Sequence, residues 1–260
     1  MGFKKVLDFY NLPYGEYALM VGTSEGEAKF LGYAEARKLV DAWKSDTNLA
    51  LFLNADHHKS FESCKAAIDA GYDTVLIDAS ALPFEENIKE THRVVDYAKS
   101  KAGEITVEGE LGYLKGESKL QETVEVQPDD FTKPEQAKEF AAKTGIDRLG
   151  VAVGNIHGIA TKQKMEIDFG LLEKINKAAP ETYLVLHGGS GLTDEDFKEA
   201  IENGITNVHI NTEVRMAYRE GLDEKLKEAP AETTPYKFLE GAVEKMREVV
   251  EEKVKVFLNV

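Results

Sequence analysis

Short apolar runs alternate with amphipathic stretches along most of the chain. The amphipathic stretches, such as AEARKLVDAWK, FESCKAAIDAG and KPEQAKEFAAKTG, repeat their apolar positions with a helical period and predict helices. The apolar runs are too short for helices and predict seven strands, at residues 17–23, 49–56, 74–80, 105–112, 149–154, 182–189 and 207–212. Strands that alternate with helices are typical of a parallel sheet covered by helices.

This strand count is one short of a closed barrel, which needs about eight strands. Residues 1–16, MGFKKVLDFYNLPYGE, are amphipathic and favour a helix rather than a first strand. A polar segment at residues 115–132 also interrupts the alternation. We therefore predict an α/β fold, a TIM (β/α)8-type barrel spanning residues 1–260 as a single domain, with its first strand missing or atypical.

Composition narrows the possible partners and the cellular compartment. The formal net charge is −15, and Lys and Arg never cluster beyond a pair, which argues against nucleic acid or an anionic membrane as partner. The single cysteine, Cys64, excludes an intrachain disulfide and a Cys-rich metal site, and we expect a buried thiol. The chain shows no signal-peptide pattern and no apolar run of membrane-spanning length, so we predict a cytoplasmic protein.

Three histidines lie at or just past the ends of predicted strands: His57, His157 and His187. The loops that follow the strands of such a barrel gather at one face, where its active site lies. Any one of these histidines could be a buried core imidazole, but three at strand ends favour a catalytic zinc site with an open fourth position. We expect His92 on the surface, while His209 could point into the barrel or toward the site.

Other polar residues follow the same strands. Gly188, Gly189 and Ser190 after His187 offer free backbone N–H groups and a hydroxyl at a helix start, which suits a phosphate. Asp56 either forms a turn that caps a helix or serves the site. Asp78 ends a strand, and the alternating Glu108 and Glu110 share one strand face, so these carboxylates form either a packed polar layer or part of the site.

Several segments together resemble the class II (zinc-dependent) fructose-bisphosphate aldolase family over residues 17–225. The resemblance rests on SEGEAKFLG, LNADH, AIDAGYDTVLIDAS, EENIKETHRVVDYA, VEGELG, AVGNIHG, LVLHGGSG and INTEVR, in that order. It implies a glycolytic lyase that reversibly cleaves fructose 1,6-bisphosphate to dihydroxyacetone phosphate and glyceraldehyde 3-phosphate. No lysine lies within a predicted strand, so a Schiff-base route lacks its amine.

The resemblance also assigns roles to individual residues. It implies zinc ligation by His57, His157 and His187, with Asp56 exchanging the C4 hydroxyl proton. Glu110 and Asp78 would stand near a second or displaced divalent metal position. The implied substrate and phosphate site comprises Gly158, Gly188, Gly189, Ser190, Asn211 and Thr212. A homodimer or homotetramer is the implied assembly.

The chain departs from the family pattern in places that bear on catalysis. The first strand with its Phe-Asn segment is absent. The loop glutamate that exchanges the carbon-bound proton falls at Ser118, and we take the adjacent Glu117 as the candidate catalytic residue. His209 stands where an asparagine is usual in the last strand.

Three alternatives stay open at this point. A tagatose 1,6-bisphosphate aldolase of the same family would share the zinc and phosphate sites. A metal-binding barrel without activity is conceivable because a missing strand would leave unpaired sheet edges. A zinc hydrolase could use the same ligands to activate water, although it gains little from a phosphate cradle.

Overall fold

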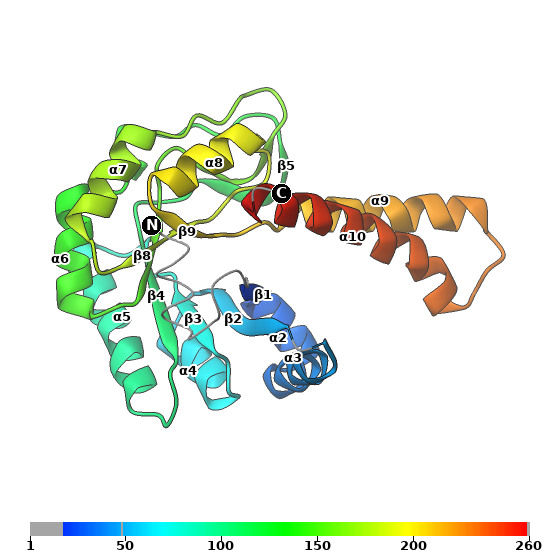
Figure 1. Ribbon diagram of the computed structural model, residues 1–260, viewed down its shortest axis with the longest axis horizontal. Coiled ribbons are helices and arrows are strands. Elements are labelled where there is room, and N and C mark those ends of the chain that lie inside the picture. Colours follow the sequence, from blue (N-terminus) through cyan, green and yellow to red (C-terminus); the bar gives the residue numbers. More distant parts are fainter. Residues whose placement is uncertain (1–17, 48, 259–260) are drawn as a thin grey trace.

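In the computed structural model, which describes residues 18–47 and 49–258, seven parallel strands form one curled sheet (Figure 1). The prediction of seven strands in a TIM-barrel-type α/β fold is confirmed. Its strands, in their order across the sheet, are β1 (Ala18–Ser24), β2 (Ala50–His58), β3 (Thr74–Ile77), β4 (Thr106–Leu111), β6 (Arg148–Val151), β8 (Tyr183–Leu186) and β9 (Ile205–Val208).

Helices follow most strands and cover the outer face of the sheet (Figure 1). They are α2 (Glu25–Leu31), α3 (Tyr33–Thr47), α4 (Phe61–Asp69), α5 (Phe84–Lys99), α6 (Pro134–Thr144), α7 (Phe169–Ala178) and α8 (Asp194–Glu202). Gly109 in β4 shows how closely they pack, because a Cβ there would lie 2.6 Å from the ring of Phe140 in α6. The glycine faces the helix, so Glu108 and Glu110 on either side of it face the barrel interior.

The curled sheet is not closed by backbone hydrogen bonds between its two outer strands. Within the described residues, β1 pairs only with β2 and β9 only with β8. The two edges meet instead through side chains, since Asn207 Nδ2 lies 3.3 Å from Met20 Sδ. The described part of the chain therefore forms an open sheet of seven strands, as the strand count predicted, and the amphipathic residues 1–16 lie outside that part.

The polar segment contributes a strand that the sequence did not predict. Gly116–Gln121 forms β5, which pairs in parallel with β7 (His157–Ala160) in a separate two-stranded sheet, and Pro128–Asp130 forms a 3-10 turn. The residues of β5 are almost all exposed and lack the apolar alternation that signals a strand. Gly116 is the register partner of His157, so this small sheet fixes the segment beside a predicted zinc ligand.

The C-terminal helices α9 (Thr212–Glu228) and α10 (Pro235–Leu258) form an arm that projects from the barrel (Figure 1). Their backbones approach closely at two glycines, because a Cβ on Gly221 would lie 2.3 Å from the carbonyl oxygen of Gly241. The end of α10 returns to the barrel, where Phe257 packs edge-on against Phe197 of α8 at 5.1 Å between ring centroids. Among the described helices, none is both long and apolar enough to cross a membrane.

Beneath the carboxyl ends of the strands, the barrel interior holds a buried guanidinium. Arg148 at the start of β6 lies 3.3 Å from Glu108 Oε2, and both side chains are buried. Its Nη atoms also donate to Asn54 Oδ1 at 3.3 Å and to the Thr74 hydroxyl, and one lies 3.1 Å from Met20 Sδ. The pair is stabilising only while both charges are present, because either one alone would be buried without its opposite charge.

We expect Arg148→Met to lower the free energy of unfolding by about 3 kcal/mol, because it strands the Glu108 carboxylate in the core. Urea unfolding of the metal-free protein at neutral pH measures the effect. The double variant Arg148→Met/Glu108→Gln is the matched control, and it should recover part of the loss because the amide carries no charge. A single variant as stable as the wild type would contradict this account of the core.

The same pair predicts a pH dependence of stability. Burial alone would raise the pKa of Glu108, but Arg148 first, and then His187 and His209, together outweigh it and lower the pKa to about 2, from an ordinary value of 4.5. Stability that comes from the pair is therefore complete above pH 4.5 and is lost as the pH falls toward 2. The difference in unfolding free energy between the wild type and Arg148→Met should shrink across that window, and a constant difference would refute the assignment.

Candidate metal centre and active site

The three predicted zinc ligands come together at the carboxyl ends of the strands. His57 lies near the end of β2, His187 directly follows β8, and His157 begins β7 after the loop that leaves β6. The ring centroid of His57 is 4.5 Å from that of His187 and 4.7 Å from that of His157. Parallel strands deliver their last residues to one face of the barrel, which is why segments far apart in sequence meet here.

A backbone irregularity aims His57 into this cluster. His57 has a φ of 47°, the one positive value among the described residues other than glycine. The register between β2 and β3 shifts between Ala55 and His58 at the same place. Such a bulge turns the His57 side chain away from the regular strand alternation, and conformations of this kind cluster at functional sites. His58, which we expected at the start of a loop, instead ends β2 and is fully buried.

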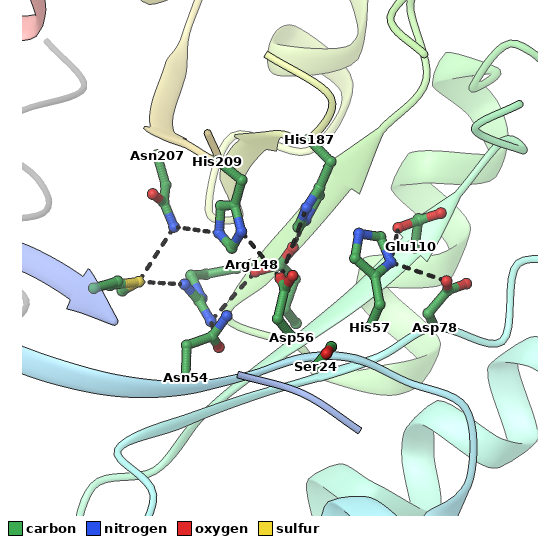
Figure 2. A network of polar contacts seen from close by, with 12 residues as sticks. Ser24, Asn54, Asp56, His57, Asp78, Glu110, Arg148, His187, Asn207 and His209 are labelled. Carbon is green, nitrogen blue, oxygen red and sulfur yellow. Dashed lines mark hydrogen bonds and ion pairs between the residues drawn. The ribbon is translucent and has the colours of Figure 1, made fainter. Parts of the chain in front are cut away.

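Two carboxylates contact the same nitrogen of His57, as Figure 2 shows. Its Nδ1 lies 2.9 Å from Asp78 Oδ2 and 3.4 Å from Glu110 Oε2, and Lys59 pairs with the same oxygen of Asp78. Burial and the neighbouring Asp78 raise the pKa of Glu110 to about 8. Burial alone would lower the pKa of His57, but the two carboxylates raise it to about 10. In the absence of a metal, His57 therefore holds a proton that a metal ion would displace.

His187 is oriented by a buried carboxylate. Its Nε2 lies 2.6 Å from Glu108 Oε1, and burial together with the nearby His209 lowers the pKa of His187 to about 4. The neutral ring therefore donates from Nε2 to Glu108 and keeps the lone pair of Nδ1 free. Burial and the charge of His57 likewise lower the pKa of His157 to about 3. Neutral imidazoles with free lone pairs are the form that binds metal ions.

Asp56 lies near Nδ1 of His187, the ring nitrogen that Glu108 does not contact (Figure 2). Its Oδ1 is 4.0 Å from His187 Nδ1 and 3.0 Å from His209 Nδ1. Burial would raise the pKa of Asp56, but His209 first, and then His57 and His187, hold it well below its usual range. The carboxyl group is therefore ionised and able to accept a proton.

The glycine-rich loop after His187 is built for close backbone approach. Gly188 has a φ of 64°, and a Cβ there would lie 2.0 Å from the carbonyl oxygen of Ile156. The Gly189 N–H donates to the carbonyl oxygen of His209 at 3.2 Å, and Ser190 Oγ accepts from the N–H of Glu213 at 3.3 Å. These contacts hold the loop against the first turn of α9.

The remaining predicted substrate residues border this loop. Gly158 in β7 has a φ of 83°, and a Cβ there would lie 2.2 Å from the carbonyl oxygen of Glu117. Asn211 is the N-cap residue of α9 but makes no side-chain capping bond, and Thr212 is the buried first residue of that helix. The Glu213 carboxylate bridges the Gly191 N–H at 2.6 Å and Lys253 Nζ at 3.1 Å. The structure thus brings the loop of Gly188, Gly189 and Ser190 to the start of α9, while Gly158 lies against β5.

One predicted catalytic residue is turned away from the cluster. The backbone of Glu117 runs beside His157 and Gly158, but its side chain is 71% exposed and its carboxylate pairs with Lys119 at 2.8 Å. Ser118, at the neighbouring position, is also exposed. In this conformation the structure does not bring a carboxylate from the segment to the histidines.

The residues present fit a divalent metal ion. Two groups have ligand atoms that all lie within 4.8 Å of one another, namely His57–Glu110–His187 and Asp56–His187–His209. Glu110 Oε2 is buried and lacks a hydrogen-bond partner among the described atoms. A buried carboxylate oxygen beside imidazole nitrogens, of which His57 gives up its proton to the ion, is a donor set suited to zinc or a similar cation.

Several residues of the site escaped the sequence analysis. Glu108 was left between a packing role and a functional one, and the structure makes it the partner of both His187 and Arg148. Asn155 was not singled out, yet its buried amide donates to the carbonyl oxygens of Val151 and His187 and so ties two loops together. An asparagine just before a strand-end histidine, in GNIHG, was the available signal. The expectations of an exposed His92 and a buried Cys64 are confirmed.

The sequence of the chain is similar to those of known aldolases. The family model for class II fructose-bisphosphate aldolase matches residues 16–260. Fructose-bisphosphate aldolases of Staphylococcus epidermidis and Staphylococcus aureus are 36% identical to the chain over 242 residues, which covers 92% of this chain and 82% of theirs.

The fold of the chain is also similar to those of solved aldolase structures. The YdjI aldolase of Escherichia coli is 29% identical with a TM-score of 0.76, covering 92% of this chain and 81% of that one. The fructose-bisphosphate aldolase of Campylobacter jejuni, at 19% identity, shares the fold with a TM-score of 0.74 over 92% of this chain and 83% of that one. The resemblance read from the sequence is confirmed, and the chain belongs to the class II fructose-bisphosphate aldolase family.

Proposed function

We propose that this protein reversibly cleaves fructose 1,6-bisphosphate to dihydroxyacetone phosphate and glyceraldehyde 3-phosphate in a zinc-dependent reaction. One observation carries the proposal: three histidine rings with flanking carboxylates stand beside a glycine-rich loop in a barrel of this family. The family match does not favour an inactive metal-binding barrel or a hydrolase. Nor do the names of the relatives favour a tagatose-bisphosphate aldolase.

We assign zinc ligation to His57, His157 and His187. A zinc ion held there would supply a Lewis acid that stabilises the negative charge developing on the ketose oxygens. Glu110 and Asp78 contact His57 and would orient it, or accept a second or displaced divalent ion. Glu108 contacts Nε2 of His187 and would orient that ring as well.

The protein side chains handle the proton and the phosphate. We assign to Asp56 the acceptance of the C4 hydroxyl proton as the bond between C3 and C4 breaks. The electron pair of that bond passes to the three-carbon half while the aldehyde forms on the other half. The phosphate of the three-carbon half would bind the Ser190 hydroxyl and the cradle N–H groups other than that of Gly189, which already donates to the carbonyl oxygen of His209. The dipole of α9 also favours an anion at the start of that helix. That cradle comprises Gly158, Gly188, Gly189, Ser190, Asn211 and Thr212.

We assign to Glu117 the return of a proton to the carbon of the three-carbon half. This role requires its carboxylate to leave Lys119 and turn toward the histidines when substrate binds. The exposure of β5 supports such a movement, because few packing contacts oppose it.

We also propose a homodimer or homotetramer. The arm formed by α9 and α10 exposes apolar side chains, including Tyr236 at 75% and Val243 at 53%, which suit a protein interface. Light scattering on the purified protein gives the mass directly, and a monomer at micromolar concentration would reject this part of the proposal.

The first test of the function is cleavage before and after removal of the metal. Chelator treatment should abolish fructose 1,6-bisphosphate cleavage and one equivalent of Zn²⁺ should restore it, because the histidines alone supply no Lewis acid. Tagatose 1,6-bisphosphate, assayed in parallel, should be cleaved more slowly. A zinc-loaded, folded protein that cleaves neither sugar would disprove the proposal.

A second test separates the role of Glu117 from that of the zinc site. Glu117→Gln should slow the exchange of hydrogen between dihydroxyacetone phosphate and D2O by about 10- to 100-fold, because the exchange needs a base at carbon. Exchange is followed by proton NMR, and Ser118→Ala serves as the control that leaves the carboxylate in place. Unchanged exchange in Glu117→Gln would assign this proton to another group.

A further inference from the structure

A fourth imidazole lies in the site, and none of the steps assigned above uses it. His209 directly follows β9, and its side chain is 15% exposed. Its ring centroid is 4.2 Å from that of His187, and its Nδ1 is 3.0 Å from Asp56 Oδ1 (Figure 2). It therefore contacts the group to which we assign the hydroxyl proton.

The neighbours of His209 determine which nitrogen carries its proton. Its Nε2 lies 3.3 Å from Asn207 Nδ2, which also points at Met20 Sδ at 3.3 Å. An amide NH2 group only donates hydrogen bonds, so Nε2 must present its lone pair to Asn207. The proton of the neutral ring then resides on Nδ1, the atom that lies 3.0 Å from Asp56 Oδ1.

The backbone holds the ring in this place. The N–H of His209 donates to the carbonyl oxygen of Leu186 at 2.9 Å, and its own carbonyl accepts from the N–H of Gly189 at 3.2 Å. His209 is thereby fixed to the end of β8 and to the glycine-rich loop. Any movement of the cradle would be transmitted to the contact with Asp56.

We propose that His209 is the positioning residue of Asp56, holding Oδ1 through its Nδ1 proton and leaving the other carboxylate oxygen to meet the substrate hydroxyl. Among the described atoms, the buried Asp56 Oδ1 has no well-aligned hydrogen bond, and its short contact is the one with His209 Nδ1 at 3.0 Å. The 17% of this side chain that solvent reaches therefore lies elsewhere on it. His209 keeps its proton throughout the cycle, and Asp56 alone gains and returns the hydroxyl proton. This inference rests on the proposed aldol cleavage.

The geometry distinguishes this role from metal ligation. Asp56, His187 and His209 form one of the groups whose ligand atoms lie close together. In the tautomer that Asn207 selects, however, Nδ1 carries a proton and Nε2 is already occupied. Ligation through Nδ1 would move the proton to Nε2 and break both contacts, and ligation through Nε2 would break the contact with Asn207.

The test compares His209→Leu with His209→Asn, two variants of nearly equal size. Asparagine places an amide N–H close to the position of Nδ1, whereas leucine has no donor. His209→Leu should lower kcat for cleavage of fructose 1,6-bisphosphate by about 10- to 100-fold with KM changed less than about twofold, and His209→Asn should restore most of the rate.

Two further measurements separate positioning from damage to the metal centre. Exchange of hydrogen between dihydroxyacetone phosphate and D2O involves no C4 hydroxyl, so it should proceed at the wild-type rate in His209→Leu. Zinc affinity, measured by competition with a chelating dye, should also be unchanged. Equal loss of exchange and cleavage, or a tenfold loss of zinc affinity, would overturn the proposal and make His209 a part of the metal site.

A final measurement does not depend on turnover. Nitrogen-15 NMR of the histidine side chains in the zinc-loaded wild type should show His209 protonated at Nδ1, with His209→Asn identifying the resonance. Protonation at Nε2 alone would reject the positioning role. If His209 is protonated at Nδ1 but the protein cleaves neither sugar, the result would count against the proposed function. The contact between His209 and Asp56 would still be established.

Discussion

The buried guanidinium of Arg148 is the contact on which the interior of this barrel depends. It reaches side chains of β1, β2, β3 and β4 from its own place at the start of β6. On one side it holds Glu108, which in turn sets the tautomer of His187. On the other side it contacts Met20, and Met20 contacts Asn207. Asn207 in turn contacts His209, which lies beside Asp56. The orientations of two active-site imidazoles therefore trace back to one cation in the core.

The site itself is placed where the backbone is least regular. His57 takes a left-handed conformation at a bulge, and Gly188 takes one in the loop after β8. A left-handed histidine costs on the order of 1 kcal/mol, and its contacts with Asp78 and Glu110 offset this cost in the folded state. The glycine avoids the cost and leaves room for the carbonyl of Ile156.

Sequence patterns predicted the parts of this structure whose signal is local. The seven strands and the meeting of His57, His157 and His187 follow from apolar runs that end in polar residues, since parallel strands share one carboxyl edge. The strand β5 was missed because GESKLQ is exposed and has no apolar alternation. The role of Glu108 could not be predicted because its partners, Arg148 and His187, lie 40 and 79 residues away in sequence. The orientation of His209 likewise depends on Asp56, which no nearby residue signals.

Glu213 joins the two parts of the molecule that otherwise stand apart. Its backbone N–H holds Ser190, while its carboxylate bridges Gly191 and Lys253 in α10. The root of the projecting arm is thus anchored in the loop that precedes α8, but its outer turn at residues 229–234 has no such tie. Evolutionary drift should be uneven as a result. The outer turn can change length freely, whereas position 213 must keep an acceptor for the Gly191 N–H as well as a negative charge for Lys253.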